Sequence, residues 1–345
     1  MAIQKPYAPT FGRKILFGVI SVTIGILTFQ KVSEISGPAF EPIIEACTNS
    51  DIPIEKFAAQ TGYHDYEPKV GLGVFNVLVC IITQFLLELR ETYPAGLLVW
   101  GSIIVVSFAA SFILQLEAGR EDAKRFSPIR FPIIVGLLFQ LFGISVMFPL
   151  IWVPAYVFGH GLGPVSKLRL QCLIPQLLPG VILTGIVFIS NTDSYLWTCA
   201  AGMLGGPILV LSPIIFWKNQ NPAQTKENSE ATLRGIRTST KFITPIATVM
   251  WYALVFVAFQ VYGSFGELWG GIWLNAGPSV RFMTVDAIIL YVATLLWVTF
   301  HSEYVAFKAL LLSLVIGPAG LLMVLGEIEE MKLDSVDFDG KKKDI

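Results

Sequence analysis

Two acidic residues lie where long apolar stretches of the sequence meet polar ones. Glu117 ends one stretch and is followed three residues later by Arg120, while Asp286 lies a turn inside another stretch. Residues three apart share a helical face, so Glu117 and Arg120 are predicted to meet. A carboxyl group within a membrane is costly unless it faces the protein interior, where it can act as an acid on an apolar substrate. The sequence therefore predicts a general acid, either Asp286 or Glu117.

Arg120 distinguishes the two candidates. A guanidinium beside Glu117 favours the carboxylate, which makes Asp286 the better acid and leaves Glu117 with Arg120 as an orienting pair. A simple ion pair at the membrane surface is the alternative for these two residues. Asp286, Ala293 and Trp297 follow one another at spacings of seven and four, so they are predicted to share one helical face.

Other polar and aromatic residues could contact a substrate. Two stripes of small and polar residues have helical spacing: Gly73, Asn76, Cys80, Gln84 and Glu88 in one, and Gly136, Gln140, Gly143 and Met147 in the other. Such stripes line a pocket or, alternatively, join neighbouring helices. Trp269 and Trp273 form either a lid over the acids or part of the aromatic belt at the membrane surface. The predicted substrate-binding residues are Asn76, Gln140, Trp273 and Trp297.

The elements that carry these residues are predicted to be membrane-spanning helices. The chain is 54% hydrophobic and 14% charged, with a mean hydropathy of +0.67, which leaves too little polar surface for a soluble globule. A crossing needs roughly 20 apolar residues. Nine stretches qualify, near 14–30, 70–90, 95–116, 131–158, 170–190, 195–217, 240–262, 283–301 and 304–326. Their runs are continuous rather than alternating, which predicts an all-α bundle of about nine spans.

The bundle is predicted to form a single domain over residues 1–345, without an internal repeat. Residues 31–69 are expected to form an extramembrane loop or a small cap, and residues 327–345 a polar tail. Alternation of the spans predicts that several charged residues gather at one membrane face: Glu117, Asp193, Glu267, Arg281 and Asp286.

Two signals for orientation conflict under this topology. Basic residues before the first span and acidic residues after it indicate a cytoplasmic N-terminus. The C-terminal sequence Lys342-Lys343-Asp344-Ile345 resembles a dilysine retrieval signal, which is read in the cytoplasm and indicates the endoplasmic reticulum. Nine spans would place the termini on opposite sides, so both signals cannot hold. A solvated lysine-rich tail is the alternative for the C-terminus.

Known catalytic motifs are absent from the sequence. There is no Asp-rich DDxxD motif, no P-loop, no GxSxG and no spacing typical of metal ligands. We therefore expect no metal and no cofactor. The expected partners are a lipophilic small molecule and the lipid bilayer, and no nucleic acid.

One stretch resembles a known family, on the residues Glu117, Arg120, Pro132, Gly136, Gln140, Gly143, Pro149 and Leu150. It is similar to fungal integral membrane terpene cyclases of the ascochlorin and ascofuranone type, found in meroterpenoid biosynthesis. The resemblance covers about one tenth of the chain. It implies that the prenyl chain of a prenylated aromatic is cyclised by protonation of an epoxide or alkene.

Two other functions remain open. A transporter or channel for a small lipophilic or ionic substrate could use the polar stripe at residues 73–88 as its path. The lack of sequence repeats and of paired broken helices counts against it. A noncatalytic scaffold or receptor is the third possibility.

Overall fold

The computed structural model of the chain describes residues 9–48, 74–120, 122–123, 127–174 and 222–336, and within these ranges it contains helices and no strand. The predicted all-α class is confirmed for this part of the chain. Five segments are long and apolar enough to cross a membrane: Phe11–Pro38, Ala95–Ala118, Lys226–Tyr262, Pro278–His301 and Glu303–Ser335. A segment crosses the membrane only if it continues in one direction and does not turn back.

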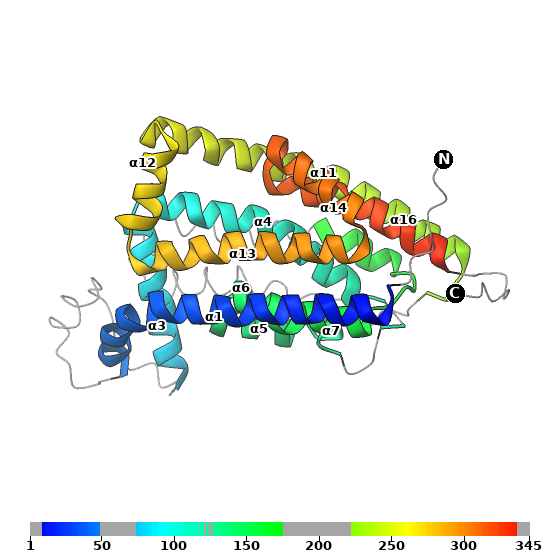
Figure 1. Cartoon of the computed structure of the whole chain (residues 1–345), viewed down its shortest axis with the longest axis horizontal. Helices are drawn as coiled ribbons and strands as arrows, with labels where there is room; N and C mark the ends of the chain where they lie inside the picture. Colours follow the sequence, from blue (N-terminus) through cyan, green and yellow to red (C-terminus); the bar gives the residue numbers. More distant parts are fainter. Residues whose placement is uncertain (1–8, 49–73, 121, 124–126, 175–221, 337–345) are drawn as a thin grey trace.

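Four long helices form the body of the molecule (Figure 1): α1 (Phe11–Thr48), α4 (Ala95–Ala118), α11 (Lys226–Tyr262) and α13 (Pro278–His301). Helices α4 and α13 pack together at the centre, α1 lies against α13, and α11 lies against α4. Arg13, near the start of α1, donates hydrogen bonds to the carbonyl oxygens of Thr299 and Phe300 at the end of α13. Helix α1 is therefore antiparallel to α13.

Helices α4 and α13 run in the same direction. Near their starts, Glu88 in α3 (Val74–Glu91) accepts hydrogen bonds from the backbone N–H and the hydroxyl of Ser279. At their ends, Lys332 binds Glu117 of α4 and lies over the ring of Tyr156, which contacts the last turn of α13. Each helix has 24 residues, about 36 Å, which is enough to cross the hydrocarbon layer.

The two ends of this helix pair define two faces of the membrane-spanning bundle. We call the face at the starts of α4 and α13 the Arg281 face, since Arg281 lies in the first turns of α13. We call the face at their ends the Arg13 face, because Arg13 binds there.

The segment predicted to cross at residues 304–326 is apolar enough to do so, but it is not one straight helix, because it turns back inside the bundle. Helix α14 (Glu303–Ile316) has 14 residues, about 21 Å, and falls short of the roughly 30 Å of hydrocarbon. The chain then returns through η4 (Gly317–Ala319), α15 (Gly320–Met323) and α16 (Leu325–Ser335). Lys308 of α14 forms an ion pair with Glu327 of α16, so the two arms lie side by side.

This re-entrant segment, Glu303–Ser335, is called hairpin B. It begins at the Arg13 face, where Glu303 pairs with Arg13 at 3.1 Å, and α16 returns to the same face. Its tip lies about midway along the length of the bundle, against α4 and α11 (Figure 1). Membranes tolerate such a broken helix where protein surrounds its exposed backbone groups.

The predicted crossing at residues 131–158 is likewise a hairpin, here called hairpin A. Its elements are α5 (Pro132–Phe142), α6 (Ile144–Met147), η2 (Phe148–Trp152) and α7 (Val153–Gly159). The rings of Phe139 and Phe148 lie 6.4 Å apart, whereas nine residues of straight helix would span about 13 Å. The short helix η1 (Pro128–Arg130), which precedes the first arm, contacts α7 at the end of the second. Hairpin A therefore also enters and leaves at the Arg13 face.

The described elements follow a similar order twice and form two structural repeats, although the sequence itself shows no internal repeat. One repeat comprises α1, α3, α4 and hairpin A, and the other α11, α12 (Phe265–Trp269) with η3 (Gly270–Leu274), α13 and hairpin B. Helix α1 packs on the returning arm of hairpin A, and α11 packs on the returning arm of hairpin B. The tip of hairpin A packs on α13, and the tip of hairpin B packs on α4. Because α4 and α13 are parallel, the relation is that of parallel repeats about an axis along the membrane normal.

Two predicted boundaries also change. The first part of residues 31–69, expected to form an extramembrane loop or a small cap, is helical, because α1 continues to Thr48. The first part of residues 327–345, expected to be a polar tail, is helical, because α16 continues to Ser335, and two of its charged residues are buried. Residues 49–69, 175–221 and 337–345 lie outside the described part, as do most of the predicted spans at 170–190 and 195–217.

Candidate functional site

Asp286 lies under the tip of hairpin A, in the interior of the bundle. It is eight residues from the start of α13, about 12 Å along the helix axis, and only 4% of it is exposed. The same carboxylate oxygen, Oδ1, accepts two hydrogen bonds from Ser145. One comes from the hydroxyl and the other, at 3.2 Å, from the backbone N–H. Among the described residues, Asp286 has no hydrogen bond or ion pair with a cation.

The local sequence of hairpin A explains this contact. Gly143 has φ +85° and ψ 141°, a conformation that residues with a side chain rarely adopt, and it separates α5 from α6. A side chain at Gly143 would also lie 3.1 Å from both Asp286 and Phe282. The break leaves the first N–H groups of the returning helix without partners in the preceding turn. One of them, on Ser145, binds the carboxyl group of Asp286.

Glu117 lies in a different cluster, at the Arg13 face. The predicted contact with Arg120 is confirmed, with Arg120 Nε 2.8 Å from Glu117 Oε2. Lys332 Nζ binds the other oxygen of Glu117 at 2.7 Å, and Arg120 Nη2 binds Glu329 at 2.5 Å. The carbonyl oxygen of Gly163 accepts a further hydrogen bond from Arg120. All four charged side chains of this ion cluster are buried.

The ion cluster has two positive and two negative side chains. Burial alone would lower the pKa of Arg120, but the neighbouring Glu117 and Glu329 raise it well above its ordinary value. Both oxygens of Glu117 accept hydrogen bonds from cations, so this residue is held as a carboxylate and has no proton to donate. The cluster joins the end of α4 to the returning arm of hairpin B, which is a structural role.

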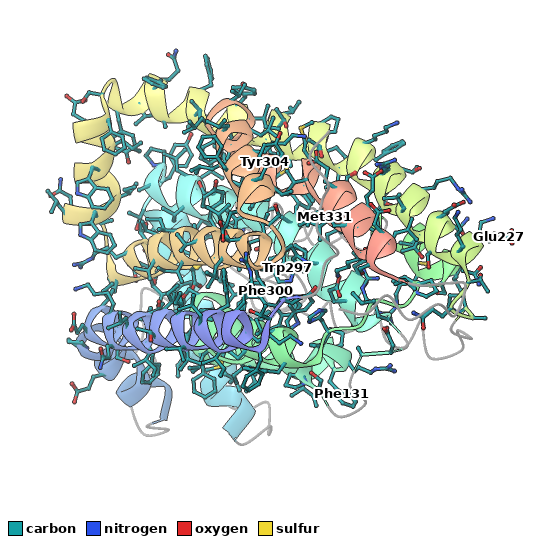
Figure 2. All side chains as sticks on the ribbon, turned by 45° about the vertical axis from the view of Figure 1, so that its right-hand side comes forward. Phe131, Glu227, Trp297, Phe300, Tyr304 and Met331 are labelled. Atoms are coloured by element: carbon teal, nitrogen blue, oxygen red, sulfur yellow. The ribbon has the colours of Figure 1, made fainter. Side chains whose placement is uncertain are left out.

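Aromatic side chains and two histidines pack beside the ion cluster. Tyr156 stacks on His160 with ring centroids 4.9 Å apart, and its hydroxyl lies 3.0 Å from His301 Nε2. Trp297 and Phe300, which are labelled on α13 in Figure 2, are fully buried and contact Tyr156. Burial, helped by the nearby cation Lys332, lowers the pKa of His160 to about 4.

The two predicted acids are not at the same membrane face, contrary to the sequence prediction. Fifteen residues, about 22 Å of helix, separate Asp286 from His301 at the end of α13. Glu117 belongs to the cluster beside that end. The prediction failed because it counted residues 131–158 as a crossing, whereas this segment folds into hairpin A. Asp286 and Glu117 therefore cannot act on one reacting group.

The other predicted site residues are divided between the two regions. Asp286, Ala293 and Trp297 are all buried in α13, as predicted, but Trp297 lies in the aromatic group beside the ion cluster. Trp273 lies in η3 and stacks on Trp269 at 5.4 Å. The backbones of Asn76 and Gln140 lie in α3 and α5, and their side chains, like Asp193, are outside the described part.

A cavity opens on the Arg281 face, near the start of α13. Its volume is about 540 Å³, and the residues that line it are Lys31, Glu34, Ile35, Pro38, Pro278 and Arg281. Lys31 and Glu34 pair with each other across a helical turn at 2.9 Å. Arg281 and Asp286 are five residues apart, about 7.5 Å along α13. Arg281 and Asp286 are therefore close in depth, but Asp286 does not line the cavity.

Three residues of these sites were not predicted. Ser145 follows the glycine of a polar stripe, and a Gly-x-Ser sequence inside an apolar run was the available signal. Glu329 and Lys332 are three residues apart, as are Glu117 and Arg120, so this spacing was the available signal. They lie in the segment that was predicted to be a tail. No family model, curated protein or solved structure matches this chain.

Proposed function

We propose that the protein is a membrane-embedded terpene cyclase that acts on a prenylated or epoxidised lipophilic substrate, with Asp286 as the general acid. The observation that carries the proposal is the environment of Asp286. It is a carboxyl group buried in the bundle interior, and in the described part of the chain its hydrogen-bond partner is an uncharged serine. An acid that starts a carbocation reaction must hold its proton, and cations hold Glu117 in the opposite state.

The reaction needs no co-reactant. Asp286 gives its proton to the epoxide oxygen, the adjacent C–O bond breaks, and the π electrons of a neighbouring double bond form a new C–C bond. The resulting cation loses a proton from carbon, and the Asp286 carboxylate accepts a proton in its turn. The substrate is isomerised and the acid is regenerated.

The surroundings of Asp286 suit a cationic intermediate. Phe282 lies against Gly143 and meets Phe85 edge to face, with ring centroids 5.4 Å apart. Aromatic faces stabilise positive charge, and exclusion of water prevents early capture of a carbocation. The family resemblance adds support, because its residues extend from the end of α4 through hairpin A, which covers the acid.

A proton-coupled transporter is the second candidate. It is favoured by the two repeats, each with a broken re-entrant helix whose tip lies in the middle of the bundle. Transporters built from repeats place their sites where broken helices meet near the membrane midplane. Asp286 would then bind and release the coupling proton.

Reconstituted protein distinguishes the two candidates. Liposomes containing it would be given a panel of epoxyfarnesylated phenols, and both the cyclised product and the movement of unchanged compound across the membrane would be measured. The proposal predicts product without net flux, whereas Glu303→Gln, at an exposed acid near the Arg13 face, should leave product formation unchanged. Flux without product across the panel would contradict the cyclase and support the transporter.

A further inference from the structure

Asp286 is separated from the surface of the bundle by the thin tip of hairpin A. The tip residues Gly143 and Ser145 lie directly on the acid and are buried. The two residues before them, Leu141 and Phe142, are 53% and 45% exposed. The described part of the chain leaves these apolar side chains uncovered, and in a membrane such a surface faces lipid. One turn of chain therefore lies between the hydrocarbon and the carboxyl group.

The depth and composition of this tip determine what can approach it. Asp286 is about 12 Å along the helix from the start of α13, which is within the hydrocarbon layer. No residue between Pro132 and Trp152 carries a charge. A charged or strongly polar solute would lose its hydration at this surface without compensation, whereas an apolar chain would not.

We propose that the substrate reaches Asp286 sideways from the bilayer, past the tip of hairpin A, and that it is a neutral, long-chain lipid whose reacting group lies within the hydrocarbon layer. This inference rests on the proposed function of Asp286 and names the class of molecule that the site takes. It excludes a water-soluble substrate that arrives through the cavity on the Arg281 face.

Hairpin B provides a matched control within the same molecule. Its tip follows the same plan, with exposed apolar residues Leu314 and Val315 just before Gly317, the other hairpin glycine with positive φ. Helix α4, on which this tip packs, has Glu117 as its one acidic residue, and that residue lies at the Arg13 face. Both tips therefore expose apolar residues in the same way, but α4 has no acid beneath the tip of hairpin B.

Photocrosslinking tests the route. The residue p-benzoylphenylalanine would replace Phe142, Leu314 or, in the Arg281-face cavity, Ile35, and each full-length protein in liposomes would be irradiated with an alkyne-tagged epoxyfarnesylated phenol. We expect several-fold stronger capture at position 142 than at 314 or 35, and loss of that capture when excess untagged compound is added. Equal capture at 142 and 314 would mean lipid contact only and would overturn the inference, as would preferential capture at 35.

A second arm separates this inference from the proposed function. The same crosslinker at position 142 would be combined with Asp286→Asn. Capture should persist, because the route does not need the proton, while product formation should be lost. If capture persists and product still forms, the route stands and the acid assignment fails. If the protein that retains Asp286 shows no stronger capture at position 142 than at position 314, the route fails. This holds whether or not Asp286→Asn changes product formation.

Discussion

At the scale of single residues, two carboxyl groups in one bundle have opposite environments. Glu117 binds two cations through both oxygens, whereas Asp286 binds the hydroxyl and N–H of Ser145. Both were candidates from the sequence because each lies at the border of an apolar stretch. What separates them is the partner supplied by a distant segment, Lys332 for one and Ser145 for the other, and spacing along the chain does not reveal such partners.

The ion cluster should be sensitive to loss of one member. Lys332→Met removes one of the two cations that bind buried Glu117, and breaking a buried pair in this way costs about 3–5 kcal/mol of unfolding free energy. The double variant Glu117→Gln with Lys332→Met should be less destabilised than the sum of its single variants. Arg237→Met breaks an exposed pair with Glu330 and should cost about 1 kcal/mol or less.

These costs would be measured by denaturation in detergent micelles. Additive effects of Glu117→Gln and Lys332→Met would contradict a direct pair. An equal cost for Lys332→Met and Arg237→Met would contradict the burial of the cluster.

His160 should make stability depend on pH. Its pKa is about 4 in the folded protein, because of burial and the Lys332 cation, against an ordinary value of 6.5. Between these values the unfolded chain binds the extra proton, so stability falls as pH is lowered from 6.5 to 4, by up to ~1.4 kcal/mol per unit from this group. Above pH 6.5 His160 is neutral in both states and does not change the free energy of unfolding with pH.

The comparison that isolates His160 is His160→Phe, whose apolar ring keeps the stacking on Tyr156 and cannot titrate. Its melting temperature should fall less between pH 6.5 and 4 than that of the unchanged protein. Parallel profiles for the two proteins would show that His160 is not the group responsible.

At the scale of elements, the glycines at the hairpin tips have a specific role. Gly143→Ala places a side chain at φ +85° beside Asp286, and we expect a loss of about 1–3 kcal/mol. Gly136→Ala, in the middle of α5 with open space around its Cβ position, should be neutral or stabilising by about 0.5–1 kcal/mol. Thermal unfolding of both variants checks this pair. A tolerated Gly143→Ala would contradict the sharp break at the tip.

The sequence predicted helices well and their breaks poorly. Hydropathy over α4, α11 and α13 identified each as a membrane helix, because a continuous apolar run of this length has few other stable forms in lipid. The same hydropathy describes residues 304–326, which fold back. The chain turns at Gly317, which has a positive φ and lies against Trp251, a residue far away in the sequence. Ser145 was not predicted for the same reason, since its contact with Asp286 depends on the helix break at Gly143.

At the scale of the whole molecule, the hairpins remove the conflict between the two orientation signals. The start of α1 and the end of α16 lie at the same face, so a cytoplasmic N-terminus and a cytoplasmic dilysine signal become compatible. Basic side chains also gather at this Arg13 face: Arg13, Lys14, Arg120, Arg130, Arg169 and Arg237. Lys31, Arg90 and Arg281 lie toward the other face. We therefore propose that the Arg13 face is cytoplasmic.

Site-directed labelling tests this topology. In a background without native cysteines, Glu303→Cys and Asp334→Cys at the two ends of hairpin B should both react with an impermeant thiol reagent from the same side. Ser264→Cys, next to α12 at the Arg281 face, should react only from the other side. Labelling at 303 and 334 from opposite sides would mean that this segment crosses the membrane after all.

The most direct test of the central claim is the rate of cyclised product formation by reconstituted Asp286→Asn beside the unchanged protein, at equal amounts and equal melting temperatures. Loss of a general acid predicts a decrease of about 100-fold or more. Asp286→Glu, which keeps the carboxyl group, should recover part of the rate. Asp286→Asn at the full rate would contradict the assignment of Asp286 as the acid.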